Sequence, residues 1–277
     1  MKIGYPCINR TLECLANILE YNIAHNILFF RISSDLVPFA SHPVCKVRWQ
    51  KIFKADLEAI GGVIKRHKIR ISMHPGQFTL INSREECVFR RSLKELRYHT
   101  EVLDLMGLGE DAKIQVHVGG VYGDKEKSVE RFVRRYRTLP VPMQRRLVIE
   151  NDERSYSVQD CLKISQATGI PVLFDVFHDS ILGSGKTAKE AIRHASASWR
   201  GKDGLPMVDY SSQQRRCRAG AHARSIDPVG FVKFLKETKP LDFDIMLEIK
   251  DKEASALKAI EIALNDKRFL RGISRLS

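Results

Sequence analysis

Eight side chains of types that bind divalent metals recur along the chain, each at or just after the end of a short apolar segment. Four are imidazoles and four are carboxylates: His74, His117, Glu150, Asp175, His178, Asp209, His222 and Glu248. Four carboxylates packed together without cations would repel one another and raise one another's pKa values, and divalent ions remove that conflict. Eight ligands exceed what one ion needs, so the set predicts two or three ions with Glu150 as a bridge.

The mixture of ligands indicates the metal and its chemistry. Imidazoles with carboxylates suit Zn²⁺ or Mn²⁺ better than Ca²⁺ or a plain Mg²⁺ site. A bound ion lowers the pKa of water towards ~7, and a second ion about 4 Å away stabilises the oxygen that leaves in an in-line displacement. Taken singly, Glu150 could instead cap a helix and His222 could be a hydrogen-bonding loop residue. For the set we predict a metal centre, and we assign catalysis to Glu150, His42, Asp175 and Glu248.

Residues 69–78, I-R-I-S-M-H-P-G-Q-F, place two further candidates beside a predicted ligand. The first half is β-branched and alternating, which predicts a buried strand, and the P-G pair forces a turn. Gln77 and Phe78 then follow His74 on one loop, where an amide and an aromatic ring could fill the gap left by displaced bases. Tyr5 is a similar candidate, and a place in the core is the alternative for both aromatic residues.

Basic side chains near the predicted strand ends could contact phosphate groups. Arg31, Lys250 and Lys252 lie near such ends, and phosphate contacts give affinity without sequence information. His42, in the loop after the second predicted strand, could bind the scissile phosphate. A surface histidine without that role is the alternative.

Composition favours an anionic partner. The chain has 277 residues, a formal net charge of +13 and a sequence pI near 9.5, with basic residues spread throughout. A basic protein without a polyanion partner is the alternative. Six cysteines form no C-x-x-C pair, no apolar run approaches the ~20 residues of a membrane span, and no signal peptide is expected. We therefore expect a monomeric protein that is cytoplasmic and, in a prokaryote, nucleoid-associated, with no membrane or protein partner.

The elements that must position these side chains alternate between strand and helix. The predicted strands span residues 2–5, 27–32, 69–73, 113–118, 146–150, 171–174, 205–210 and 244–249. The predicted helices span residues 11–21, 50–67, 84–106, 128–137, 157–168, 186–199, 227–237 and 253–264. Eight such units predict an α/β fold, a single (β/α)8 TIM-barrel domain over residues 1–277, whose strand ends converge on one face. An open doubly wound sheet is the alternative.

Several segments along nearly the whole chain resemble the UV damage endonuclease family. They are G-Y at 4–5 with Asn9, R-I-S-S-D-L-V-P-F-A-S-H at 31–42, M-H-P-G-Q-F at 73–78, V-H-V-G-G at 116–120, I-E-N-D at 149–152, F-D-V-F-H at 174–178, D-Y-S-S-Q at 209–213 and M-L-E-I-K at 246–250. The resemblance implies a TIM barrel related to endonuclease IV that nicks DNA immediately 5′ to UV photoproducts and some other lesions.

The same resemblance implies a metal cluster, usually discussed with manganese, with Zn²⁺ or Mg²⁺ as alternatives. One ion would be held by His74, His117 and Glu150, a second by Glu150, Asp175, Asp209 and Glu248, and a third by His178 and His222. It also implies that the damaged DNA meets Tyr5, Asn9, Gln77, Phe78, Arg31 and Lys250.

The chain departs from the family pattern at three positions. Family members can carry a carboxylated lysine where Met207 stands, two residues before a histidine ligand that is Asp209 here. A thioether cannot be carboxylated, so the third ion is expected to be held more loosely or to be absent. Phe78 stands where a tyrosine can occur, and it keeps the stacking face without the hydroxyl.

The sequence therefore predicts a metal-dependent endonuclease acting on damaged double-stranded DNA, with abasic sites among the further candidate lesions. A divalent-metal sugar isomerase of the same architecture is the alternative enzyme, but it has no need of a basic face. A nucleic-acid-binding module without catalysis is the other alternative. The carboxylate-rich strand ends argue against it, because uncompensated carboxylates repel DNA.

Overall fold

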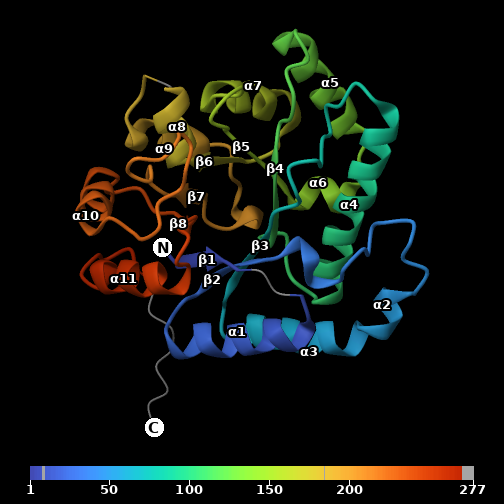
Figure 1. The fold of residues 1–277 in the computed structure, drawn as a ribbon, viewed down its shortest axis with the longest axis horizontal. Coiled ribbons are helices and arrows are strands. Elements are labelled where there is room, and N and C mark those ends of the chain that lie inside the picture. Colours follow the sequence, from blue (N-terminus) through green and yellow to red (C-terminus); the bar gives the residue numbers. More distant parts are fainter. Residues whose placement is uncertain (8–9, 184, 270–277) are drawn as a thin grey trace.

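Eight parallel strands close into a barrel in the computed structural model, which describes residues 1–7, 10–183 and 185–269 (Figure 1). Each strand pairs with its neighbours in chain order, and β1 closes the sheet against β8. The strands are β1 Ile3–Pro6, β2 Phe29–Ile32, β3 Arg70–Met73, β4 Lys113–His117, β5 Leu147–Glu150, β6 Val172–Asp175, β7 Met207–Tyr210 and β8 Asp244–Leu247. The (β/α)8 prediction is confirmed, and all eight strands overlap their predicted ranges.

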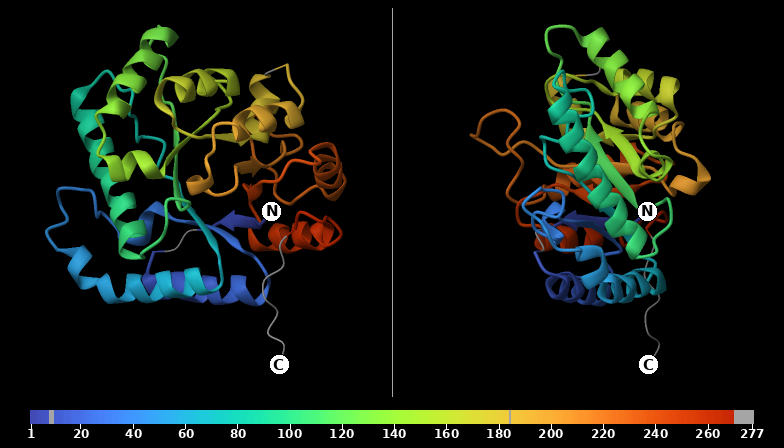
Figure 2. Two further views of the ribbon diagram at one scale, coloured as in Figure 1. Left: turned by 180° about the vertical axis from the view of Figure 1, so that it is seen from behind. Right: turned by 90° about the vertical axis from the view of Figure 1, so that its right-hand side faces the viewer.

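Helices surround the barrel on the outside, as the ribbon shows in Figure 1 and in the two further views of Figure 2. Their bounds are α1 Leu12–Ala24, α2 Trp49–Ile52, α3 Lys54–Arg66, α4 Glu86–Leu105, α5 Lys125–Arg137, α6 Val141–Arg146, α7 Val158–Thr168, α8 Val176–Leu182, α9 Ala188–Ser196, α10 Pro228–Glu237 and α11 Glu253–Ala263. Among the helices of the described residues, none is long and apolar enough to span a bilayer.

The helix prediction was wrong in three places. The helix expected over residues 50–67 is divided at Phe53, and α2 is held separately by Trp49, whose ring packs edge-on against Tyr98 of α4. Helices α6 and α8 were not predicted, because both are too short to show a helical repeat of apolar residues. The omission of α8 affects the description of the site, because this helix begins directly after Asp175. Asp175 caps the helix by accepting a hydrogen bond from the backbone N–H of His178.

Alternate residues of each strand point into the lumen and form successive layers. Strand β4 shows the pattern with Lys113, Gln115 and His117, which run from the amino to the carboxyl end. Lys113 and Gln115 are buried and His117 is partly exposed, so the lumen opens at its carboxyl end. A middle layer is apolar and consists of Phe29, Val148, Leu173, Met207 and Met246.

The register of the sheet brings predicted ligands together in pairs. His117 of β4 lies opposite Glu150 of β5, and Asp175 of β6 lies opposite Asp209 of β7. Because these residues lie at or near the carboxyl ends of parallel strands, their side chains meet at one mouth of the barrel.

Candidate metal centre

The first group of candidate ligands is His74, His117 and Glu150, each of which offers one ligand atom within 4.8 Å of the others. Oε1 of Glu150 lies 2.8 Å from Nδ1 of His117 and 3.4 Å from Nε2 of His74. Nδ1 of His117 is buried but forms no well-directed hydrogen bond within the described residues. A buried nitrogen left in this way beside a carboxylate fits a metal ligand.

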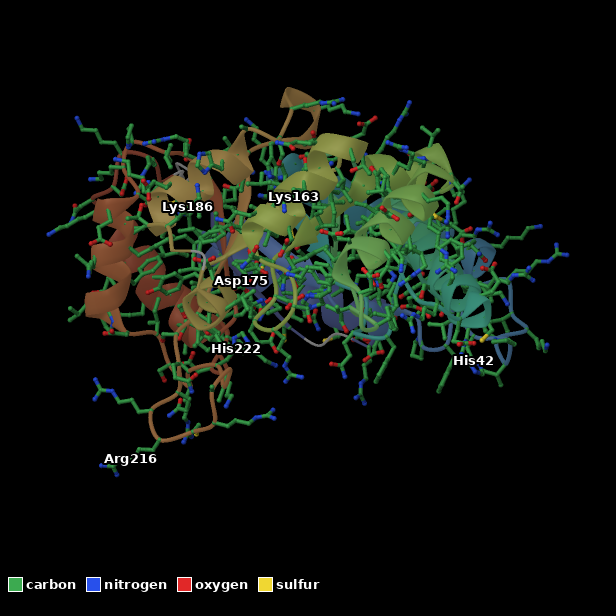
Figure 3. All side chains as sticks on the ribbon, turned by 90° about the horizontal axis from the view of Figure 1, so that it is seen from above. His42, Lys163, Asp175, Lys186, Arg216 and His222 are labelled. Atoms are coloured by element: carbon green, nitrogen blue, oxygen red, sulfur yellow. The ribbon has the colours of Figure 1, made fainter. Side chains whose placement is uncertain are left out.

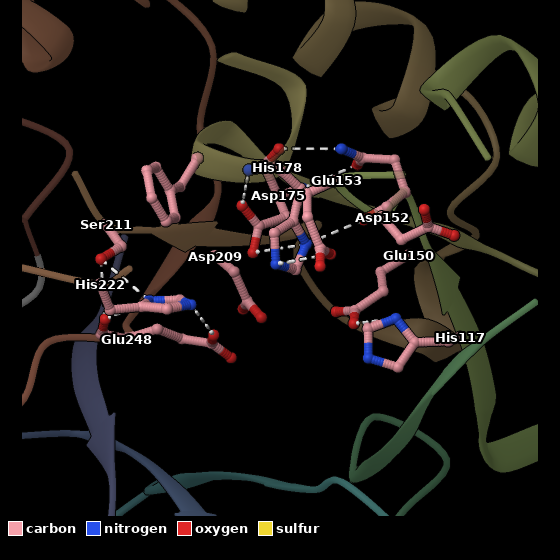
Figure 4. A network of polar contacts seen from close by, with 12 residues as sticks. His117, Glu150, Asp152, Glu153, Asp175, His178, Asp209, Ser211, His222 and Glu248 are labelled. Carbon is pink, nitrogen blue, oxygen red and sulfur yellow. Dashed lines mark hydrogen bonds and ion pairs between the residues drawn. The ribbon is translucent and has the colours of Figure 1, made fainter. Parts of the chain in front are cut away.

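The second group is Asp175, Asp209 and Glu248, whose ligand atoms also lie within 4.8 Å of one another (Figure 4). Arg31 is buried beside it: Nη2 donates to both carboxylate oxygens of Asp209 at 2.8 and 2.9 Å, and Nη1 donates to Glu248. Arg31 thus pairs with two of the three carboxylates in this group, and a divalent ion could balance the remaining negative charge.

His178 and His222 lie beside the second group. Nδ1 of His178 is 3.3 Å from Asp175, and Nε2 of His222 is 3.9 Å from Glu248. Their rings are 6.2 Å apart between centroids (Figure 4). The structure therefore brings all eight predicted ligands to one mouth, six of them in two tight groups.

Backbone carbonyl oxygens orient the imidazoles. Nδ1 of His74 meets the Pro75 carbonyl at 3.0 Å, and Nδ1 of His222 meets the Glu248 carbonyl at 2.8 Å. Nδ1 of His178 likewise meets the Asn151 carbonyl at 3.1 Å. A hydrogen bond on one ring nitrogen fixes the tautomer and leaves the other for a metal, which is the arrangement found around metal-binding histidines. The donor set and its orientation therefore fit divalent metal ions.

The protonation of the carboxylates reflects their burial and their neighbours. Burial raises the pKa of Asp175 to about 7, helped by Glu248 and Glu150, against the opposing effect of His178. Burial likewise raises the pKa of Asp209 despite Arg31. Burial also acts against ionisation of Glu150, but His117 and His74 outweigh it and hold its pKa well below the ordinary value. Within the second group, Asp175 therefore retains a proton near neutral pH that a bound cation would displace.

Two adjoining clefts lead to this mouth. A cleft of about 590 Å³ is lined by His74, His117 and Gln77, and a neighbouring one of about 460 Å³ is lined by His42 and Phe78. Phe78 is 79% exposed, so the core alternative for this residue does not hold. Gln77 and Phe78 lie on the surface beside the ligand group, as the turn after His74 predicts.

The other predicted DNA contacts differ from what the sequence suggested. Tyr5 is buried, and its hydroxyl donates to Asn22 at 3.0 Å, so the structure places it in the core. Arg31 is also buried, because its charge is engaged by two carboxylates inside the lumen, and it presents no surface cation. Lys250 is exposed after β8, whereas Asn9 lies outside the described residues.

A family model described as UV-endonuclease UvdE matches residues 8–276. The chain belongs to the UvdE family. A UV DNA damage endonuclease of Clostridium perfringens (strain 13 / Type A) is 44% identical over 253 residues, 91% of this chain and 61% of that protein. Another, of Bacillus cereus (strain Q1), is 36% identical over 276 residues, 99% of this chain and 86% of that protein. The chain thus spans less than two thirds of the Clostridium relative.

Solved structures agree with this membership of the UvdE family. The crystal structure of SacUVDE is 43% identical and superposes with a TM-score of 0.90, covering 95% of this chain and 98% of that one. Endonuclease IV from Thermus thermophilus has 15% identity, a TM-score of 0.65 and coverage of 95% and 99%. D-psicose 3-epimerase from Clostridium cellulolyticum has 12% identity, a TM-score of 0.63 and coverage of 95% and 98%. The last two show the shared fold alone.

Sequence reasoning missed the polar residues that connect the ligand groups of this UvdE-family chain. The side-chain amide of Gln115 donates to Asp209 at 2.7 Å and also to Glu150, so it joins the two groups. Asn151 exchanges two hydrogen bonds of 2.9 Å with the backbone of Asp175, which ties the ends of β5 and β6 together. Gln115 could have been found, because it precedes His117 by two residues on one strand and must face the same lumen.

Proposed function

We propose that this chain is a metal-dependent DNA-repair endonuclease that nicks duplex DNA 5′ to UV photoproducts, with abasic and other distorting lesions as further substrates. The observation that carries the proposal is the pair of imidazole and carboxylate groups at the barrel mouth of a UvdE-family chain. The net charge of +13 supports a polyanionic substrate over a sugar.

We propose two or three ions, with Mn²⁺ as the metal. His74, His117 and Glu150 would hold one, and Asp175, Asp209 and Glu248 a second with help from Glu150. His178 and His222 would contribute to the binding of a third ion. That ion would be held more loosely, because the thioether of Met207 cannot be carboxylated to give a further ligand. Bound divalent ions supply Lewis-acid activation of water and stabilisation of the charge that develops at phosphorus.

The residues of the chain itself would align the reactants. Gln115 keeps Glu150 and Asp209 at a fixed separation, and Arg31 holds Asp209 and Glu248 in one orientation. His42 is exposed on the cleft wall and accepts the Val44 N–H at Nδ1, which leaves Nε2 for the scissile phosphate. These contacts would restrict the ligands before substrate arrives, which favours one geometry for in-line attack.

Gln77 and Phe78 would select the damage. An intact duplex resists unstacking by a few kcal/mol and a distorted photoproduct resists less, so a wedge at this point discriminates without reading base sequence. The exposure of Phe78 supports this role, because an exposed aromatic ring can stack on a base.

The test is incubation of the protein with UV-irradiated and untreated supercoiled plasmid, each with Mn²⁺ and with chelator. Nicking of the irradiated plasmid in Mn²⁺ alone is expected. Sequencing of the product ends on a duplex with one photoproduct gives the side of the cut. An irradiated plasmid that stays supercoiled in every divalent metal would overturn the proposal and would favour a metalloenzyme that acts on a small molecule.

A further inference from the structure

An arginine-rich loop after β7 forms a hairpin that projects from the barrel mouth. We name residues 212–224 the basic hairpin. Its tip lies at Arg216, which is labelled in Figure 3. The same loop projects away from the barrel in the right-hand view of Figure 2. Its two arms are joined by an antiparallel bridge between Gln213 and His222. Two further backbone hydrogen bonds of 2.7 and 2.8 Å hold the arms together.

Side-chain amides fix the shape of the basic hairpin. The amide nitrogen of Gln213 donates to the carbonyls of Gln214 and Arg218 at 3.0 and 2.9 Å, and its oxygen accepts from the Gly220 N–H at 3.0 Å. The amide oxygen of Gln214 accepts from the Arg224 N–H at 2.6 Å. The hairpin is therefore organised internally by polar bonds.

The guanidinium groups of the hairpin arginines are unpaired among the described residues. Arg215, Arg216, Arg218 and Arg224 are exposed, and within the described part of the chain none of their guanidinium groups forms an ion pair or hydrogen bond. Arg31, Arg70 and Arg146, by contrast, are each paired with a carboxylate. Clustered guanidiniums repel one another, so this arrangement suits a surface that binds anions.

The base of the hairpin is attached to the candidate metal centre. His222 lies at the base and bonds the Glu248 carbonyl, while Lys250 N–H donates to the Ala223 carbonyl at 3.2 Å. Asp251 N–H donates to the Arg224 carbonyl at 3.0 Å. In Figure 3 Arg216, His222 and His42 face the same side of the molecule, with His222 between the other two. The base of the hairpin therefore adjoins the ligand groups, and the loop extends outward from there to Arg216.

We propose that the basic hairpin is an arm that binds the phosphate backbone of duplex DNA on one side of the metal centre, independently of sequence and damage. The inference rests on the proposed function for the identity of the polyanion. A guanidinium matches a phosphate with two parallel hydrogen bonds, and such contacts hold a duplex in register without reading bases. The arm would supply affinity for any duplex, while Phe78 on the other side responds to the lesion.

The experiment compares two triple variants with the unmodified chain. One is Arg215→Gln, Arg216→Gln and Arg218→Gln. The control is Lys65→Gln, Arg66→Gln and Lys68→Gln, at the end of α3 and in the turn that precedes β3, at the opposite end of the barrel. Both remove three exposed charges, and the match extends to the backbone, because Arg216 and Lys68 have φ values of 58° and 54°. Binding of labelled undamaged duplex is measured in chelator over a salt titration.

The hairpin variant is expected to lower the slope of log affinity against log salt by about 2–3, since each phosphate contact contributes about 0.9. Its affinity at low salt should fall by about tenfold or more, equally for damaged and undamaged duplex, while the control stays close to the unmodified chain. Unchanged melting temperature and metal content show that the variant is folded. Equal losses in the two variants, or an unchanged slope in the hairpin variant, would overturn the proposal.

The outcome is separable from that of the proposed function. If the unmodified chain never nicks irradiated plasmid but the hairpin variant alone loses duplex binding, the nuclease proposal fails and the arm stands. If nicking occurs while the hairpin variant binds and responds to salt as the unmodified chain does, the nuclease proposal stands and the arm is rejected.

Discussion

The two ends of the barrel lumen both bury charged side chains, but they differ in how those charges are paired. At the amino end, Arg70 meets Asp244 at 3.1 Å and Lys113 meets Asp203 at 2.6 Å, and all four side chains are buried. Each cation there has one carboxylate. The apolar layer that contains Phe29 and Met207 separates this end from the candidate metal centre.

At the carboxyl end, the four carboxylates of the candidate metal centre lie near a single guanidinium, which pairs with two of them. Arg31 pairs with Asp209 and Glu248, whereas Glu150 and Asp175 have only imidazoles and amides beside them. The two ends therefore differ in how their charges are balanced, although both ends bury charged side chains. A balanced set is neutral by itself, whereas an excess of carboxylates is neutralised either by protons or by a cation from outside.

The largest expected effect is on stability, from Asp203→Ala at the amino end. This change leaves Lys113 buried without its carboxylate, and breaking one buried pair costs roughly 3–5 kcal/mol. Urea unfolding measures the loss in the free energy of unfolding. Mn²⁺ should not reverse this loss. A loss below about 1 kcal/mol, or metal rescue, would show that the two ends do not differ as described.

Arg31→Met should destabilise the chain in chelator by about 3 kcal/mol, because Asp209 and Glu248 lose the guanidinium with which they pair. Unlike Asp203→Ala, this variant should regain most of its stability in Mn²⁺, since an ion can replace the missing charge. Unfolding curves of both variants with Mn²⁺ and with chelator make the comparison. Absence of rescue in Arg31→Met would contradict the view that the mouth needs external cations.

Glu150→Gln should lower bound metal and nicking by about 100-fold or more while the protein stays folded. It removes a ligand charge shared by His74 and His117, and even the outer partners of metal ligands are worth about 10–100-fold. Elemental analysis and plasmid nicking measure the two effects. Near-normal activity would reject the bridging role, and active protein without divalent metal would reject the cluster.

Phe78→Ala tests a residue outside both charged ends. Because stacking on an aromatic ring contributes roughly 1–3 kcal/mol per base, binding to duplex with one photoproduct should weaken about 10- to 100-fold. Affinity for the matched undamaged duplex and the metal content should not change. Equal losses on both duplexes would make Phe78 a general contact and remove the wedge.

The smallest effect is a pH dependence confined to the mouth. The pKa of Asp175 is raised from 3.8 to about 7, so the folded apo-protein keeps a proton that the unfolded chain releases. This stabilisation is complete below about pH 4 and is lost as pH rises through about 7. Metal binding must displace the proton, so Mn²⁺ affinity should rise up to about tenfold per pH unit below about pH 7.

Calorimetric Mn²⁺ titrations at several pH values measure this effect. The pKa of His117 is raised to about 9, chiefly because Glu150 outweighs the effect of burial, so a weaker rise should continue above neutral pH. An affinity that does not change between about pH 5.5 and about pH 8 would mean that no ligand is protonated before metal binds.

The sequence alone predicted the barrel, because strands and helices alternate eight times along the chain. It also predicted that the eight candidate ligands, four histidines and four carboxylates, lie at one mouth of the barrel, since the carboxyl ends of parallel strands share one face. The resemblance to the UV damage endonuclease family, which the family match confirms, favoured an endonuclease over a sugar isomerase of the same architecture. These features could be predicted because they depend on the spacing of apolar residues and on residue types within short segments of the chain.

Other features depend on contacts between residues far apart in the chain. Arg31 resembles a surface cation in sequence, and only the closed barrel brings it to Asp209 and Glu248, 178 and 217 residues away. Tyr5 likewise looks available until its hydroxyl meets Asn22. A side chain's exposure and partners are set by every element packed around it, so tertiary structure decided which charges are paired within the protein and which are not.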